Sequence, residues 1–236
     1  MYVKRDWSIS IDEKEYIAQM SDSFARLLQT PAKIDTFQSA VKEVKEAIEP
    51  AACWDRFPIQ KFLHDKLVLA NGVRLGGGPV VSVMGGAEEL IVAVCTIGPA
   101  ADRLIEEAQK TRQLFRALVL NDLAAWAVDI VRQQLCRCFE EEAKEQGLHI
   151  SAPLSPGESA WSVQDQAVIF SLLDAGQINV SLSPSMVMSP VKSLSLILGV
   201  GSRAVGIEGA SNCDFCTIKE RCAYQHLRPY GRQAMA

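Results

Sequence analysis

The sequence predicts an α+β fold, with N-terminal helices and long helices packed against a mixed or antiparallel sheet. Three observations support it. The first sixty residues contain no glycine and carry helix-like apolar spacing, residues 66–98 form short apolar stretches separated by glycine turns, and a long helical pattern follows Pro99. Helices and hairpin-like strands in this order favour α+β over a regular βαβ repeat.

Two helical patterns occupy the N-terminal part of the chain. Their apolar residues recur every three or four positions: Tyr16, Met20, Phe24 and Leu27, and then Phe37, Val41, Val44 and Ile48. Pro31 and Pro50 stand where these helices would be interrupted, since proline removes a backbone donor and restricts the preceding residue. Two or three helices are therefore expected before residue 60.

Three apolar stretches between residues 66 and 98 are expected to be strands, namely LVLANGVRL, VVSVM and LIVAVCTIG. Tight turns are predicted at Asn71-Gly72, at the glycines of 76–78 and at Gly85-Gly86. The triple glycine is interpreted as a plain turn, because no Lys-Ser/Thr pair follows it and the next stretch resembles a strand, unlike a phosphate-binding loop.

The second half of the chain continues the α+β pattern. A helical segment is expected from Pro99 to about Gln146, broken once near Thr111 and stopped by Gly147. After a proline-rich crossing, a second helix is expected to end at Gly176, and two strands should follow within 179–201. We divide the chain into an N-terminal helical segment 1–62, a core 63–205 and a cysteine-containing segment 206–236.

Charge and composition exclude some classes of function. The net charge is −4 and the basic residues are scattered, so no cationic field exists for nucleic acid. No apolar run reaches the roughly 18 to 20 residues that cross a bilayer, and the first residues lack the apolar core of a signal peptide. A cytoplasmic protein without a membrane or nucleic-acid partner is expected.

The C-terminal cysteines carry an independent chemical signal. Cys213-x2-Cys216-x5-Cys222 begins with the spacing of a metal knuckle, and His226 lies four positions further along. These four side chains could form a Cys3His zinc site. The three thiolates with a ligand from elsewhere could instead hold an iron-sulfur cluster, or they could be free thiols. Cys136 and Cys138 are expected to be structural, and the isolated Cys53 and Cys95 are expected to be buried.

Four stretches, in order, resemble the activation (reactivation) domain of cobalamin-dependent methionine synthase, in the manner of a small stand-alone member of that family. They are Val94–Gly98 for the family's Val-Thr-Ile-Gly, Leu120–Ala124 for its Ala-Asp-Arg-Leu-Ala, Ser155–Gly157 for its Arg-x-x-Pro-Gly-Tyr, and Leu182–Pro190 with Lys192–Ser195 for its Leu-Thr-Glu-Ser-x-x-Met-x-Pro and Ser-Val-Ser. Their order and spacing make the combination more specific than any piece.

The resemblance implies chemistry on a corrinoid. In that family, the domain holds S-adenosylmethionine in a shallow groove so that its methyl group can reach cobalt during reductive reactivation of cob(II)alamin. The protein positions the reactants, and the cofactors perform the chemistry. Such a groove uses a carboxylate for the ligand's ammonium, a cation for its carboxylate and exposed turn backbone.

This chain departs from the family pattern at three positions. Pro153 replaces the family arginine, Glu158 replaces the tyrosine, and Trp126 stands where the family has an acidic residue. Loss of the arginine removes a fixed cation that would attract a ligand carboxylate, and the added Glu158 carboxylate would repel it. S-adenosylmethionine is therefore a doubtful ligand.

The candidate ligand site combines six residues, each with a structural alternative. Asp122 could contact ligand or form a structural bond within an apolar helix. The turn of Ser155, Pro156 and Gly157 is expected on conformational grounds, whether or not it binds ligand. Trp161 could stack on a planar ligand or pack a helix start. Lys192 could contact an anionic ligand or corrinoid side chain, or could be solvated.

These observations favour an accessory protein for corrinoid-dependent methyl transfer, which supports reactivation of a corrinoid protein or binds it and need not turn over substrate itself. One alternative is a corrinoid or tetrapyrrole binder, or an adaptor without catalysis. Another is an iron-sulfur redox protein. The expected partner is a corrinoid protein or a cobalamin-dependent methyltransferase, and the sequence does not define the oligomeric state.

Overall fold

The computed structural model describes residues 1–19, 26–158 and 160–207. Its centre is an antiparallel sheet in the order β4-β3-β2-β5-β9-β6, with β1 paired to the outer side of β2. The strands of this sheet are β1 (Tyr2–Lys4), β2 (Ala51–Leu63), β3 (Lys66–Leu69), β4 (Arg74–Leu75), β5 (Glu89–Thr96), β6 (His149–Ile150) and β9 (Ser193–Gly201). A separate small hairpin joins β7 (Ser181–Leu182) to β8 (Met188–Ser189).

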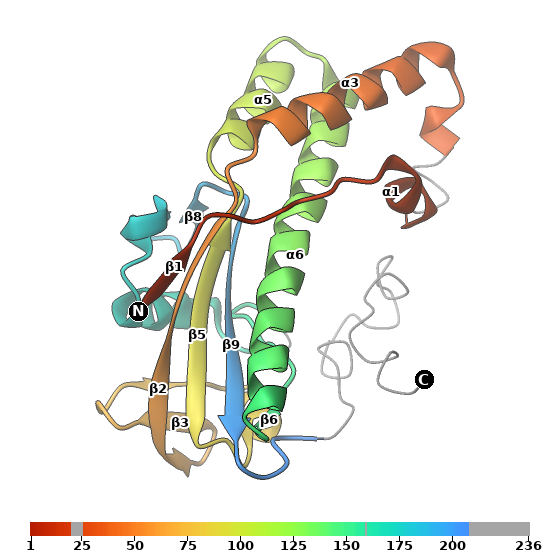
Figure 1. Cartoon of the computed structure of the whole chain (residues 1–236). Helices are drawn as coiled ribbons and strands as arrows, with labels where there is room; N and C mark the ends of the chain where they lie inside the picture. The colour runs from red at the N-terminus through yellow and green to blue at the C-terminus, as the bar shows by residue number, and fades with distance from the viewer. Residues whose placement is uncertain (20–25, 159, 208–236) are drawn as a thin grey trace.

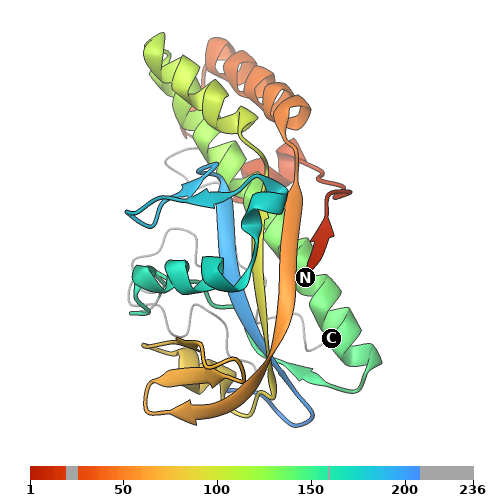
Figure 2. The ribbon, with the colours of Figure 1, turned by 90° about the vertical axis from the view of Figure 1, so that its left-hand side faces the viewer.

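Helices cover both faces of the sheet. The α-helices are α1 (Glu13–Gln19), α3 (Pro31–Ala47), α4 (Val80–Met84), α5 (Ala100–Lys110), α6 (Leu114–Glu145) and α7 (Gln166–Leu172), and the 3₁₀ segments are η1 (Arg26–Leu28), η2 (Val163–Asp165) and η3 (Ala175–Ile178). The long helix α6 runs along the central strands (Figure 1), and α7 lies on the opposite side of the sheet (Figure 2). The α+β architecture predicted from the sequence, with long helices packed against an antiparallel sheet, is confirmed.

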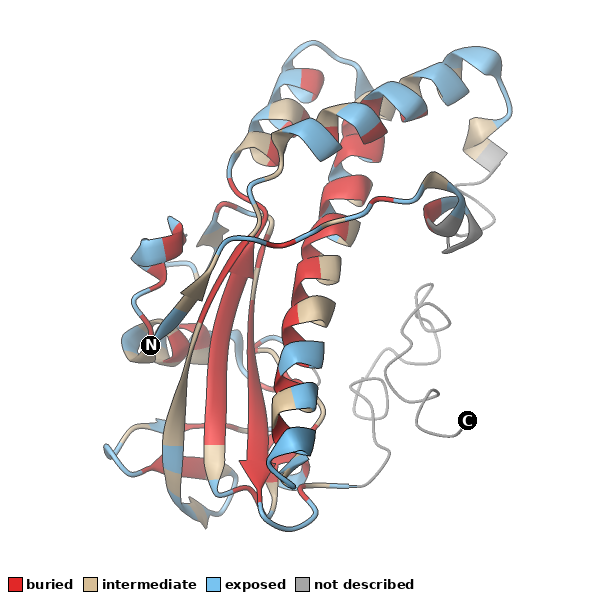
Figure 3. Cartoon of the chain, in the orientation of Figure 1, coloured by how far each residue is buried: buried red, intermediate tan, exposed pale blue. Residues whose placement is uncertain are grey.

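The central strands are buried on both sides. Successive side chains of a strand point to opposite faces, and in β5 Ile91 and Ala93 face one core while Leu90, Val92 and Val94 face the other. All five are fully buried, which explains why this stretch is a continuous apolar run rather than an alternating one. Figure 3 shows the same pattern as buried strands beside a buried stripe of α6.

We call the two sides the α6 face and the α7 face. The α6 face is covered by α3, α5 and α6, whose buried residues include Val44, Ile105 and Leu123. The α7 face is covered by α4, η3 and α7, with Met84 and Ile169 in its core. Each face therefore has a hydrophobic core of its own. Burying one such side chain contributes roughly 1.5–3 kcal/mol to the stability of the fold.

Several local predictions are confirmed. The turn at Asn71-Gly72 joins β3 to β4, with Gly72 at φ +85°, and the long helical segment is broken at Arg112, at φ +55°, between α5 and α6. Gly147, at φ +67°, follows α6 as expected. Helices also form at two of the predicted N-terminal positions.

Other local predictions are wrong. The stretch Val80–Met84 is the short helix α4 and not a strand, because a run of five residues is too short for its periodicity to tell the two apart. The helix predicted to end at Gly176 ends at Leu172, since Leu173 is extended, and Gly176 lies within η3. Strands β1 and β2 were not predicted, and β2 crosses the division placed at residue 62.

Candidate functional site

Asp122 lies on α6, on the α6 face of the sheet. Its carboxylate Oδ2 accepts a hydrogen bond of 2.7 Å from the Tyr16 hydroxyl. The Tyr16 ring is buried and packs against Phe37 and Trp126, with centroids 5.7 and 5.1 Å away. If Asp122 has a structural role, Tyr16 is its hydrogen-bond partner. Contact of Asp122 with a ligand stays a prediction.

Lys192 lies immediately before β9, and its half-buried ammonium contacts α6. Its Nζ donates to Oδ1 of Asn121 at 2.8 Å. Burial lowers the pKa of Lys192, and the charges of Asp102 and Asp122 oppose that shift. Asp102 also accepts a hydrogen bond from the Val191 backbone N–H at 2.6 Å. The structure thus brings Lys192 and Asp122 into one electrostatic neighbourhood.

The predicted turn at Ser155–Gly157 is present. Glu158 N donates to the Ser155 carbonyl at 3.1 Å, Gly157 N donates to the Trp161 carbonyl at 2.9 Å, and Gly157 adopts φ +93°. The turn follows an antiparallel bridge between Leu154 and Ile197 at the edge of β9. Gly157 is exposed, and because its N–H is already donated to Trp161, its carbonyl is the backbone group that it offers to a ligand.

The sheet separates the turn from Asp122. Leu154 and Trp161, which flank the turn, belong to the core of the α7 face, whereas the neighbours of Asp122 on α6 belong to the core of the α6 face. The structure therefore does not join Asp122, Lys192 and the turn in one groove. Two separate candidate regions result, with Lys192 and Asp122 on one side and the turn on the other.

Trp161 occupies the core and not an open surface. Its side chain is 2% exposed, and its indole Nε1 donates to Oδ2 of Asp165 at 2.7 Å. A ligand could stack on this ring only if neighbouring residues moved away from it. The burial of Trp161 agrees with the alternative in which its ring packs in the core. Contact of Trp161 with a ligand stays a prediction.

Polar residues gather on the α7 face near the turn, and the sequence did not identify them as a group. The Ser195 hydroxyl donates to Oε1 of Gln166 at 2.7 Å, and the Ser193 hydroxyl donates to that of Thr96 at 2.9 Å. All four side chains are buried. The alternation of serine with leucine from Ser193 to Leu196 was the signal for Ser193 and Ser195, but nothing local indicated that Gln166 would be their neighbour.

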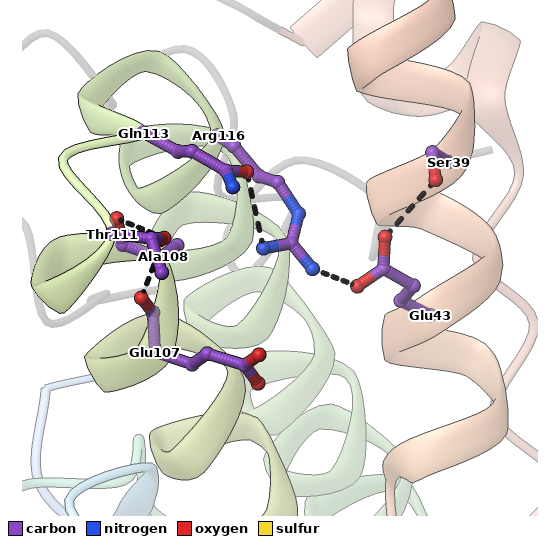
Figure 4. Close-up of polar contacts among 7 residues, drawn as sticks. All are labelled: Ser39, Glu43, Glu107, Ala108, Thr111, Gln113 and Arg116. Atoms are coloured by element: carbon purple, nitrogen blue, oxygen red, sulfur yellow. Dashed lines mark hydrogen bonds and ion pairs between the residues drawn. The ribbon is translucent and has the colours of Figure 1, made fainter.

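A surface groove of about 740 Å³ lies between α3 and the start of α6. Figure 4 shows the Arg116 guanidinium on one wall, between the Gln113 side chain at 3.4 Å and the Glu43 carboxylate, to which Ser39 also donates at 3.0 Å. Arg116 is therefore held in place by partners on both helices. The lining residues are Asp35, Thr36, Ser39, Arg112, Gln113, Leu114, Phe115 and Arg116.

The predicted metal ligands Cys213, Cys216, Cys222 and His226 lie outside the described residues. Within the described part of the chain, no group of three or more His, Cys, Asp or Glu side chains could hold a metal ion. Of the cysteines there, Cys53, Cys95 and Cys136 are buried and Cys138 is exposed. The zinc, iron-sulfur and free-thiol alternatives all stay predictions.

Burial controls the chemistry of two of these thiols. It raises the pKa of Cys95 to about 12, with Arg132 opposing the shift, and the pKa of Cys53 to about 11, with the charge of Asp174 adding to it. Both thiols stay protonated at neutral pH and are poor nucleophiles. The burial expected of both thiols is confirmed.

The three positions that depart from the family pattern have structural surroundings of their own. Pro153 is buried beside the β9 edge, Glu158 is half-buried within the turn, and Trp126 packs on Tyr16. None of the three supplies a cation for a ligand carboxylate. Glu158 in addition places an anion beside the exposed backbone of Gly157.

In the described residues, no helix is long and apolar enough to span a bilayer.

Comparison with known proteins gives a match among solved structures. No protein-family model and no curated protein matches the chain. Among solved structures, the chain is similar to the MetH reactivation domain bound to AdoHcy, with 13% sequence identity, a TM-score of 0.58, and coverage of 84% of this chain and 78% of that one. The chain has the fold of that reactivation domain.

Proposed function

We propose that the protein is an accessory component of corrinoid-dependent methyl transfer, which supports reductive reactivation of a corrinoid protein or binds that protein. The similarity to the MetH reactivation domain over 84% of the chain carries the proposal. MetH is a cobalamin-dependent methionine synthase, so a corrinoid enzyme is the partner that the fold suggests. Because a fold hosts many functions, the residues must supply the rest of the case.

The residues offer a corrinoid two kinds of contact. Lys192 has three donor protons, of which Asn121 takes one, so its ammonium can still contact an amide or phosphate oxygen of a corrinoid side chain. The turn at Ser155–Gly157 presents backbone at the exposed Gly157. Bound corrinoid would supply the methyl-transfer chemistry. Because the two contacts lie on different sides of the sheet, its periphery would be held either by Lys192 or by the turn.

An S-adenosyl ligand is the finer part of the proposal. The similar reactivation domain was solved with AdoHcy, which makes this ligand class the one to test. Glu158 beside the turn disfavours the carboxylate of such a ligand, since like charges at short range repel. We therefore expect weak binding of S-adenosylmethionine at most, and a corrinoid-directed role that does not depend on it.

The packing of Trp126 favours a second candidate, an adaptor or corrinoid binder without catalysis. Its ring lies 5.1 Å from the Tyr16 ring, where the family has an acidic residue. An aromatic side chain in this position contributes to the core and not to ligand recognition. Such an adaptor would still bind a corrinoid or a corrinoid protein, but it would not use S-adenosylmethionine as a methyl donor.

The test is an anaerobic titration of cob(II)alamin with the protein, followed by visible absorption. The proposal predicts a saturable spectral change. Lys192→Met weakens binding roughly tenfold or more if Lys192 holds the corrinoid, the size expected for a lost charged contact, and leaves it unchanged if the turn holds it. The control is Lys42→Met, because Lys42 is exposed on α3 and pairs only with Glu46 among the residues described. An unchanged spectrum with the folded wild-type protein would refute corrinoid binding.

Calorimetry distinguishes a reactivation component from an adaptor. Heat of binding with S-adenosylmethionine or AdoHcy at millimolar ligand supports the reactivation component. If the protein binds cob(II)alamin but gives no heat with either ligand, the adaptor is supported. The iron-sulfur alternative is tested by the visible spectrum and metal content of anaerobically purified protein, since a cluster, zinc and bare thiols differ in both.

A further inference from the structure

The carboxylate of Asp165 joins two segments that are far apart in the sequence. Its Oδ2 accepts a hydrogen bond from the Gly76 backbone N–H at 2.8 Å and another from the Trp161 indole Nε1 at 2.7 Å. Both are charge-assisted bonds, which are stronger than neutral ones. Neither the fold class nor the proposed ligand contacts require this arrangement.

The Gly76 end of the arrangement is rigid. Gly76 is buried at φ +126°, and a Cβ there would lie 2.9 Å from the Asp65 carbonyl oxygen, so only glycine fits. Lys66 Nζ donates to the Gly76 carbonyl, while Asp165 accepts from its N–H. The Gly76 residue is thus held on both its donor and its acceptor side.

The Trp161 end connects to the predicted ligand turn. The Trp161 carbonyl accepts from Gly157 N at 2.9 Å, and its backbone N–H donates to the Glu158 carbonyl at 2.9 Å. The indole is therefore tied to Asp165 and the backbone to the turn. A displacement of the indole would be transmitted to Gly157 through one residue.

We propose that Asp165 is a positioning residue, whose carboxylate fastens Trp161, and with it the Ser155–Gly157 turn, to the loop at Gly76. The turn is then preformed, which avoids the entropy cost of ordering it when a ligand binds. This inference rests on the proposed function for the ligand-facing role of the turn. The hydrogen-bonded link itself rests only on the contacts above.

The link is tested in the full-length protein by ¹⁵N NMR of Asp165→Ala, with Asp174→Ala as matched control. Asp174 is an exposed carboxylate on the same face and accepts from the Gln177 side chain. In Asp165→Ala, the Trp161 indole resonance should shift and the Gly76 amide should exchange faster with solvent. In Asp174→Ala, both signals should match the wild type. Unchanged signals in Asp165→Ala would overturn the link.

The positioning role is tested by the same cob(II)alamin titration. Asp165→Ala should weaken binding roughly tenfold, as expected when a preformed contact must be ordered on binding, whereas Asp174→Ala should bind as the wild type does. A broken link with unchanged affinity would overturn the positioning role. Absence of binding by the wild type would overturn the proposed function and this role with it, while the NMR signals would still decide the link.

Two gentler variants cover the case in which Asp165→Ala does not fold. Asp165→Asn keeps an acceptor oxygen without the charge, and Trp161→Phe removes the indole donor but keeps an aromatic ring. Each should bind cob(II)alamin more weakly than the wild type, by less than about tenfold, and the Gly76 amide should exchange faster in Asp165→Asn. Wild-type affinity and exchange in Asp165→Asn, with wild-type affinity in Trp161→Phe, would contradict the proposal.

Discussion

The two faces of the central sheet differ although they are built from the same strands. On the α6 face, β5 and β9 present Ile91, Ala93, Cys95, Leu196 and Leu198, all fully buried against long helices. On the α7 face, the same strands present valines in the middle and hydroxyl groups at one end, where Thr96, Ser193 and Ser195 are buried and hydrogen-bonded. These strands present only apolar side chains and a thiol to the α6 face, and on the α7 face they end in buried hydroxyl groups.

This difference separates stability from site geometry. Apolar packing is non-directional and depends on the area buried, whereas each buried hydroxyl must have a correctly placed partner. The α7 face therefore fixes positions more narrowly, and the turn at Ser155–Gly157 and the Asp165 link lie on it. We infer that the α6 face mainly stabilises the fold, and that the α7 face mainly sets the shape of the candidate region at the turn.

The largest expected effect is on the α6 face. Leu123→Ala removes a fully buried side chain from α6 and should lower the free energy of unfolding by about 2–5 kcal/mol. The matched control is Leu118→Ala on the same helix, where the side chain is 46% exposed and the loss should be below about 0.5 kcal/mol. Urea denaturation measures the free energy of unfolding of both variants. Equal losses would contradict the conclusion that the side chain of Leu123 stabilises the fold through its burial.

A second effect compares one buried thiol on each face. Cys95 and Cys53 stay protonated in the folded state to a pKa of about 12 and about 11, whereas in the unfolded chain they ionise near 9.0. The unfolded state therefore loses protons first, and stability should fall as pH rises from about 9 towards 12. Urea midpoints measured across this range should fall less steeply in Cys95→Ala and in Cys53→Ala than in the wild type; an unchanged slope in both variants would contradict the assigned burial.

A smaller effect is expected in the polar network of the α7 face. Ser195→Ala leaves the buried Oε1 of Gln166 without its 2.7 Å donor and should cost about 1–3 kcal/mol. Gln166→Leu combined with Ser195→Ala should cost less than the sum of the two single changes, because both polar groups are then removed. Additive losses in a double-mutant cycle would mean that the bond contributes little.

Local chemistry explains which parts of the fold could be predicted from the sequence. The break between α5 and α6 and the turns at Gly72 and Gly157 follow from residues that adopt unusual φ values or stop helices. Strand β2 was missed because it carries Pro58 and several half-exposed polar residues, so neither clean alternation nor a continuous apolar run identifies it. Val80–Met84 was misassigned because it is too short for periodicity to decide.

The candidate site was predictable residue by residue but not as a whole. The turn and Lys192 could be chosen from their local sequence. The separation of the turn from Asp122 and Lys192 by the sheet could not be predicted, since it depends on which face α6 covers. The bond from Asp165 to Gly76 spans 89 positions, and no local pattern encodes it.

The most direct test of the division between the faces is hydrogen exchange of the full-length protein with and without cob(II)alamin, under anaerobic conditions. The account predicts slower exchange in the segment 153–161 and around Gly76 on addition of cob(II)alamin, with little change in α6 between Leu123 and Phe139. Slower exchange confined to that part of α6, or no change anywhere in the chain, would contradict it.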